Sequence, residues 1–152
     1  MYDGLKAFFS NPVLIPAVIA WTIAQVGKVP IEYIQTRRWN WALLFQAGGM
    51  PSSHSALVTA TAHAAGLHYG FNSGVFAVAC VLTIVVMYDA TGIRRQAGKH
   101  AEIINAMIND LASGHPLKEE QLREVLGHTP MQAFSGFVLG IVIAQITWSL
   151  WG

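Results

Sequence analysis

The composition of this 152-residue chain excludes an ordinary water-soluble domain. Hydrophobic residues make up 53% of the sequence and charged residues only 11%, whereas soluble domains carry roughly 25% charged residues. The single cysteine, Cys80, lies in an apolar run, so one chain holds neither a disulfide framework nor a cysteine metal site. The formal net charge of +1 gives no reason to expect a nucleic-acid partner. We therefore expect an integral, multi-pass membrane protein in contact with the lipid bilayer.

Four long apolar stretches predict four transmembrane helices, because about 20 apolar residues suffice to cross a bilayer. The spans are expected at residues 7–27, 54–70, 74–90 and 130–151. The second and third form a hairpin around a turn-like Gly-Phe-Asn-Ser-Gly run at residues 70–74. We predict an all-α fold in which residues 1–152 form a single integral membrane domain.

Two polar segments, 28–53 and 89–129, connect these spans and are expected to carry the functional site. Between the third and fourth spans we expect two short interfacial amphipathic helices. One begins near Pro116, and the other has apolar residues at helical spacing, namely Ile103, Ile104, Met107, Ile108 and Leu111.

The distribution of basic residues predicts the orientation of the chain in the membrane. If the spans alternate in direction, both polar segments lie on one face, and that face carries the basic residues apart from Lys6. The positive-inside rule makes this face cytoplasmic. A phosphate-binding site would gather basic residues on its own face whatever the topology, so the rule has a competing explanation.

The first chemical motif is the run Gly-Gly-Met-Pro-Ser-Ser-His-Ser-Ala at residues 48–56, where a flexible turn leads into a membrane helix. Ser52 or Ser53 is expected to cap this helix. Its free backbone N–H groups and the positive end of its dipole would attract an anion, with His54 beside it. The alternative is a well-capped helix with a histidine at the membrane interface.

The second motif surrounds His128, at the start of the fourth span. Thr129 is a candidate N-cap, Pro130 a first helical residue, and Gln132 stands where a capping-box side chain reaches back. A purely structural role for Gln132 is the alternative. Two histidines at two helix starts on one face suit phosphoryl transfer, because one imidazole can attack phosphorus while the other protonates the leaving oxygen.

Phosphoryl transfer also needs fixed positive charge around the phosphate oxygens. The candidates are Lys28, Arg37, Arg38, Arg94, Arg95 and Arg123. The alternatives are snorkelling anchors at helix ends for the arginines and an ion pair with Glu32 for Lys28. Asp89 closes the third span, where a carboxylate needs a partner such as a site histidine or a nearby arginine, or forms a structural ion pair.

The remaining histidines give no metal-binding pattern. His63 and His68 are expected to be hydrogen-bonded packing residues within the second span, and His100 and His115 lie in the polar segments without a clear partner. The spacing matches no standard ligand set, so we expect no metal and no cofactor.

At these motifs the chain resembles the divergent branch of the type 2 phosphatidic acid phosphatase superfamily, which is related to vanadium-dependent haloperoxidases and histidine acid phosphatases. Pro-Ser-Ser-His at residues 51–54 is similar to that superfamily's Pro-Ser-Gly-His, and Gly-His-Thr-Pro at residues 127–130 is similar to the segment around its nucleophilic histidine. The resemblance implies that His128 is the nucleophile, that His54 is the general acid, and that Ser52 and Ser53 hold phosphate oxygens.

This chain also differs from the parent family's motifs at several positions. Gln132 stands where the parent family has an aspartate, and an amide can orient an imidazole but cannot stabilise its charge. Asp89 is a candidate to replace it. Lys28 is followed by Arg37 and Arg38 at a spacing that places them off its helix face, and Arg94 and Arg95, in a run typical of the divergent branch, are as plausible as Arg123 for phosphate binding.

We predict a membrane-embedded phosphatase that hydrolyses a lipid phosphate monoester or an isoprenyl pyrophosphate through a phosphohistidine intermediate. The first alternative is a catalytically weak membrane protein that binds phosphate or lipid in the same anion pocket. The second is a small transporter or structural subunit, favoured only if the histidines do not converge. The expected partners are a lipid phosphate substrate and the bilayer, and a homodimer is compatible with the sequence.

Overall fold

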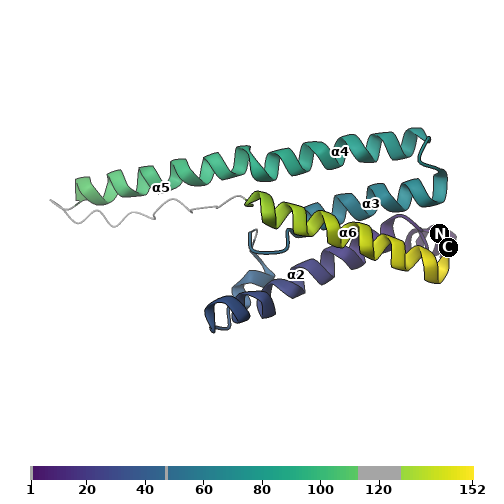
Figure 1. The fold of residues 1–152 in the computed structure, drawn as a ribbon, viewed down its shortest axis with the longest axis horizontal. Coiled ribbons are helices and arrows are strands. Elements are labelled where there is room, and N and C mark those ends of the chain that lie inside the picture. The colour runs from purple at the N-terminus through teal and green to yellow at the C-terminus, as the bar shows by residue number, and fades with distance from the viewer. Residues whose placement is uncertain (1, 47, 113–127) are drawn as a thin grey trace.

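The computed structural model describes residues 2–46, 48–112 and 128–152, and every regular element within these ranges is a helix (Figure 1). In chain order the elements are α1 (Tyr2–Phe9), α2 (Leu14–Thr36), the short 3-10 helix η1 (Trp41–Leu44), α3 (Ser53–Tyr69), α4 (Gly74–Thr91), α5 (Ile93–Ala112) and α6 (Pro130–Trp151).

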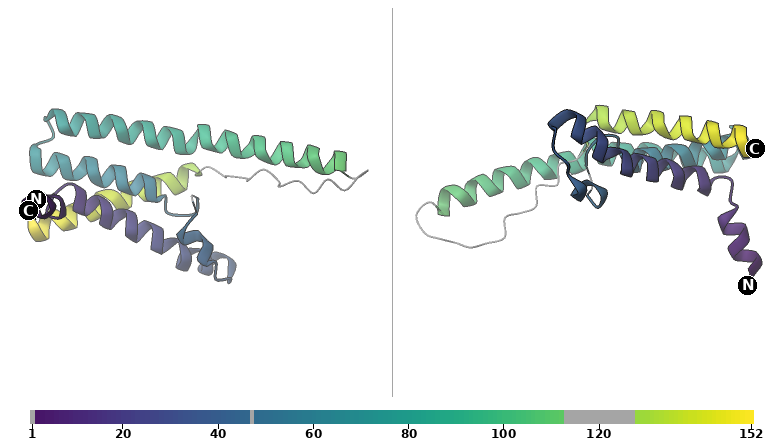
Figure 2. Two further views of the ribbon diagram at one scale, coloured as in Figure 1. Left: turned by 180° about the vertical axis from the view of Figure 1, so that it is seen from behind. Right: turned by 90° about the horizontal axis from the view of Figure 1, so that it is seen from below.

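Within the described part of the chain, three helical stretches are long and apolar enough to cross a membrane: Leu14–Thr36, Gly74–Asn109 and Pro130–Trp151. The expected all-α fold is thereby confirmed, and three of the four expected spans have the necessary length and composition. The remaining one, α3, is 17 residues long. It lies in the middle of the bundle and packs on α2, α4 and α6 (Figures 1 and 2).

Helix α2 lies further along the chain than the expected first span. The Asn11 side chain accepts a hydrogen bond from the backbone of Leu14 at 3.1 Å, which starts a new helix after α1. This helix continues through Lys28 and ends at Thr36. Lys28 is therefore a residue of the membrane helix itself rather than of a connecting loop.

Small side chains line the contact between α3 and α6. Ala56 and Ala60 of α3 are fully buried and face Gly140 of α6, where a Cβ atom would lie 2.6 Å from the Ala56 carbonyl oxygen. Residues four apart share one face of a helix, and small residues let two membrane helices approach closely. The alanines of α2 join the same core, which comprises Ala17, Ala20, Ala24, Ala56, Ala60, Ala64 and Ala144.

Helices α4 and α5 run almost in line, with a break at Gly92, and α5 projects beyond the rest of the bundle (Figure 1). The amphipathic helix expected around Ile103 is thus present but longer than expected, and Ile103, Met107 and Leu111 are exposed. The second expected amphipathic helix, near Pro116, lies outside the described residues.

One end of the bundle collects the segments that carry the sequence motifs. The end of α4 and the starts of α3 and α6 meet there, whereas the N- and C-terminal ends of the chain both lie toward the opposite end, separated from each other (Figures 1 and 2). The fold therefore brings residues near positions 28, 52, 89 and 128 into one region.

Candidate active site

The start of α3 is capped by Ser52. Its hydroxyl oxygen accepts hydrogen bonds from the backbone N–H of Ser55 at 3.3 Å and from the Ser55 hydroxyl at 3.1 Å. Ser52 and Ser53 are almost completely buried. The preceding turn contains Gly48 and Gly49 with φ of 112° and 77°, a region that favours glycine. The sequence motif thus produces the capped helix start that an anion site requires.

The start of α6 is a complete capping box. Thr129 Oγ1 accepts the backbone N–H of Gln132 at 3.3 Å, and Gln132 Oε1 accepts the backbone N–H of Thr129 at 3.0 Å. Pro130 occupies the first turn. The expected capping roles of all three residues are confirmed.

His128 is 5% exposed and is held from two sides. Its backbone N–H donates to the carbonyl oxygen of Ala90, at the end of α4, at 3.0 Å. Its Nδ1 lies 3.4 Å from Gln132 Oε1, which is long for a hydrogen bond. Both contacts orient the imidazole relative to the bundle.

Gln132 favours one arrangement of the His128 imidazole. Gln132 Oε1 already accepts the backbone N–H of Thr129, so it is an acceptor toward the imidazole as well. A neutral imidazole that donates from Nδ1 to this oxygen would carry its lone pair on Nε2.

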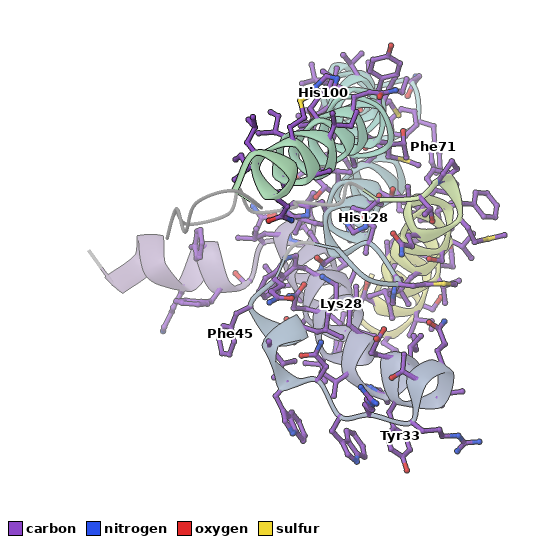
Figure 3. The ribbon with its side chains drawn as sticks, turned by 90° about the vertical axis from the view of Figure 1, so that its left-hand side faces the viewer. Lys28, Tyr33, Phe45, Phe71, His100 and His128 are labelled. Atoms are coloured by element: carbon purple, nitrogen blue, oxygen red, sulfur yellow. The ribbon has the colours of Figure 1, made fainter. Side chains whose placement is uncertain are left out.

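Lys28 is buried with its ammonium group inside the bundle (Figure 3), and only 1% of its surface is exposed. Its Nζ donates to Gln25 Oε1 at 2.8 Å, to the Gln46 carbonyl oxygen at 3.3 Å and to Ser53 Oγ at 3.5 Å. A buried ammonium is costly unless its protons are accepted by other groups. Helix α2 thus places a positive charge next to Ser53, in the serine motif at the start of α3.

Gln25 is a site residue that the sequence motifs missed. Besides accepting from Lys28, its amide nitrogen donates to the Leu43 and Leu44 carbonyl oxygens at 3.1 and 2.9 Å. It fixes the position of Lys28 against the loop that follows α2. The signal available in the sequence was a glutamine three residues before a lysine in an otherwise apolar helix.

A cavity of about 150 Å³ opens between α2, the turn before α3 and the start of α6. Its lining includes Lys28, Glu32, Gly49, Thr129 and Gln132. Most of the exposed lining is polar, which suits a charged ligand. Lys28 and Glu32 thus border the same cavity, while the Nζ atom of Lys28 is directed to the acceptors named above.

Among the residues that the structure describes, the cavity lining does not include the other candidates or His128 itself. His54 is exposed in the first turn of α3, and Asp89 is half-buried next to Ala90, which accepts from His128. Arg94 and Arg95 belong to the first turn of α5. Arg123 lies outside the described residues, as does His115.

Several residues fall outside this region. Arg37 and Arg38 are exposed beyond the end of α2. His63 lies 3.1 Å from Gln145 Oε1 of α6, as expected of a packing histidine, and His68 borders a separate cavity near Trp148. His100 is exposed on α5, away from His128 and Lys28 (Figure 3).

Comparison with known proteins identifies the family. A sequence model described as the Divergent PAP2 family matches residues 9–143. The chain is 39% identical over 148 residues to the uncharacterized membrane protein YuiD of Bacillus subtilis (strain 168), an alignment that covers 90% of this chain and 94% of that protein. No solved structure matches. The chain is therefore a membrane protein that belongs to the Divergent PAP2 family.

Proposed function

We propose that this protein is a membrane phosphatase that removes phosphate from a lipid phosphate monoester or an isoprenyl pyrophosphate. The observation that supports this most strongly is the shared polar cavity at one end of the bundle. Lys28 contributes its positive charge from α2, and Gln132, which contacts the imidazole of His128, lines the same cavity from α6. Membership of the Divergent PAP2 family also supports a phosphatase.

The proposed reaction has two steps. His128 Nε2 attacks phosphorus, and the bond from phosphorus to the leaving oxygen, which belongs to a lipid alcohol or to a lipid monophosphate, breaks while His54 gives that oxygen a proton. Water then attacks the phosphohistidine while His54 takes a proton from the water; the bond from phosphorus to Nε2 breaks, and inorganic phosphate leaves. The position of Gln132 Oε1 next to Nδ1 supports the first step, because a proton held on Nδ1 would leave Nε2 free to attack.

Three groups of residues would stabilise the negative charge of the phosphate oxygens and the positive charge on His128. Lys28 and the N-terminal N–H groups of α3, with Ser52 and Ser53, would bind the phosphate oxygens, and a phosphate oxygen would replace the 3.5 Å contact from Lys28 to Ser53. Arg94, Arg95 and Arg123 would add cations from the polar segment. Asp89 would supply the carboxylate that Gln132 lacks, since it adjoins the Ala90 carbonyl that contacts His128.

We also propose that α3 completes a fourth passage through the membrane. Both chain ends lie at the end of the bundle opposite His128, which requires an even number of passages (Figure 1). At 17 residues α3 is at the lower limit for a span, and its burial among the other helices reduces its contact with lipid. The basic residues would place the site on the cytoplasmic side.

A second function, phosphate or lipid binding without efficient turnover, is favoured by Gln132. A neutral amide orients the imidazole of His128, but it does not stabilise the positive charge that develops during attack. The cavity and its cation would be retained for binding.

The deciding experiment measures phosphate release by the purified protein in detergent from a panel of lipid phosphates and pyrophosphates, with chelator present. We expect release that vanadate inhibits and that is lost in His128→Ala and in His54→Ala, while both variants keep the thermal unfolding profile of the wild type. Undiminished release in both variants would rule out the phosphohistidine mechanism. Saturable phosphate binding without release in the wild type would establish the second function.

A further inference from the structure

An apolar groove of about 690 Å³ runs between α4 and α6. Its walls include Ile84, Tyr88 and Thr91 of α4 and Met131, Ala133 and Phe134 of α6. Nearly all of the exposed lining is apolar. Both helices have the length and composition of membrane spans, so the groove opens sideways toward lipid.

The groove ends at the candidate active site. Met131 lines both the groove and the polar cavity that contains Lys28 and Gln132. The hydrogen bond from the His128 backbone N–H to the Ala90 carbonyl joins α6 to α4 at the same level, between Tyr88 and Thr91 on one side and Pro130 on the other. An elongated molecule lying in the groove would thus have one end beside Pro130 and Met131, at the start of α6 that follows His128.

We propose that this groove holds the hydrocarbon tail of the substrate, so that a lipid phosphate enters sideways from the bilayer. The inference rests on the proposed function and adds the substrate class: a phosphate monoester with a long tail and a compact head. The polar cavity, at about 150 Å³, has room for roughly five water-sized volumes of about 30 Å³ each, which suits a single phosphate group better than a bulky diester head.

The groove acts by orientation rather than by hydrophobic affinity. A tail gains little by leaving lipid for an apolar protein surface, because lipid is equally apolar. Held between α4 and α6, however, the tail limits the positions of the phosphate relative to His128, and misplacement by about 1 Å can cost roughly 100-fold in rate. Tail contacts should therefore affect long-chain substrates and leave small soluble phosphates unaffected.

The first test is photolabelling of the wild type in detergent and in liposomes, which needs no turnover. The probe is hexadecyl phosphate with a diazirine near the tail end, and the control is hexadecanol with the same diazirine. We expect the phosphate probe to label α4 and α6 around Ile84 and Phe134, and vanadate to suppress this labelling. The alcohol should label lipid-facing surfaces without that preference. Identical patterns for the two probes would overturn the inference, because the groove would then hold only bulk lipid.

The second test narrows the groove with Ile84→Trp and uses Val81→Trp as the matched control. Both residues are exposed on α4, at 67% and 62%, and Val81 does not line the groove. We expect Ile84→Trp to lower kcat/KM for hexadecyl phosphate about tenfold, with p-nitrophenyl phosphate hydrolysis unchanged and Val81→Trp like the wild type. Equal kcat/KM in both variants would refute the groove while leaving the phosphatase intact. Vanadate-sensitive labelling without any phosphate release would support the groove and refute hydrolysis.

Discussion

The backbone N–H of Ser52 donates to the carbonyl oxygen of Gln132 at 2.9 Å, so the N-cap of α3 is bonded to the first turn of α6. Each of these residues also orders its own helix start, Ser52 as the cap of α3 and Gln132 as the returning side chain of the capping box. The two motifs, which are 80 residues apart as counted from 52 to 132, therefore form one rigid unit. The consequences of this unit can be tested by mutation.

Gly136 permits this contact, and a larger residue there should separate the two helices. A Cβ atom on Gly136 would overlap the Ser52 carbonyl oxygen and lie 3.0 Å from Ser55 Cβ. We expect Gly136→Val to destabilise the protein by roughly 1–3 kcal/mol and to abolish phosphate release, as measured by thermal unfolding in detergent and by turnover.

Gly27 offers the matched control in α2. A Cβ atom there would meet no described atom within 4 Å. Gly27→Ala should therefore stabilise the helix by about 0.5–1 kcal/mol. Equal unfolding temperatures for Gly136→Val and the wild type would contradict the close packing of α3 on α6.

Restoring a carboxylate at position 132 should increase turnover. In Gln132→Glu, one carboxylate oxygen can still accept the Thr129 N–H, and the negative charge is favoured at the start of a helix. The carboxylate would also stabilise positive charge on His128. We expect kcat to rise at least about tenfold, measured as steady-state phosphate release, and Gln132→Leu to lower it. A decrease in Gln132→Glu would show that the amide itself is required.

Lys28→Met should weaken phosphate binding without unfolding the bundle. Methionine has a similar length and removes the charge, so the loss of a charged hydrogen bond should lower the affinity for vanadate roughly 10- to 100-fold. Inhibition curves and KM values provide the measurement. Lys6→Met, on the exposed side of α1, serves as the control and should behave like the wild type. Unchanged vanadate inhibition in Lys28→Met would remove Lys28 from the site.

The pair formed by His63 and Gln145 should contribute to stability and not to chemistry. These side chains link α3 to α6 at 3.1 Å within the membrane bundle, and such interhelical hydrogen bonds average about 0.6 kcal/mol. We expect His63→Phe to retain full turnover and to unfold at a slightly lower temperature. A double-mutant cycle with Gln145→Leu measures the coupling, and loss of activity in His63→Phe alone would point to a proton path instead.

The helix starts were the most predictable part of the structure. Ser52, Thr129 and Gln132 take the capping roles expected of them because capping depends on residues only a few positions apart. The hairpin turn was predictable for the same reason, and α3 ends at Tyr69 while α4 begins at Gly74. Local chemistry alone determines these features.

The extent of α2 was not predictable from hydropathy. A charge-free window ends before Lys28, yet the helix continues past it because Gln25, Gln46 and Ser53 accept its protons. Of these partners, only Gln25, three residues before Lys28, is local. Gln46 and Ser53 are 18 and 25 residues away in the sequence, so no local pattern reveals them. For the same reason, the sequence identified His128 as a candidate but did not reveal that its backbone is bonded to Ala90 of α4.

Both chain ends lie toward the end of the bundle opposite the candidate site, which has a practical consequence (Figure 2). A fluorescent protein or affinity tag attached at either end would lie on the side away from Lys28 and His128, leaving the cavity accessible. Reporters that fluoresce or fold on only one side of the membrane should therefore give the same answer from both ends. A single pair of fusions would then show on which side of the membrane the candidate site lies.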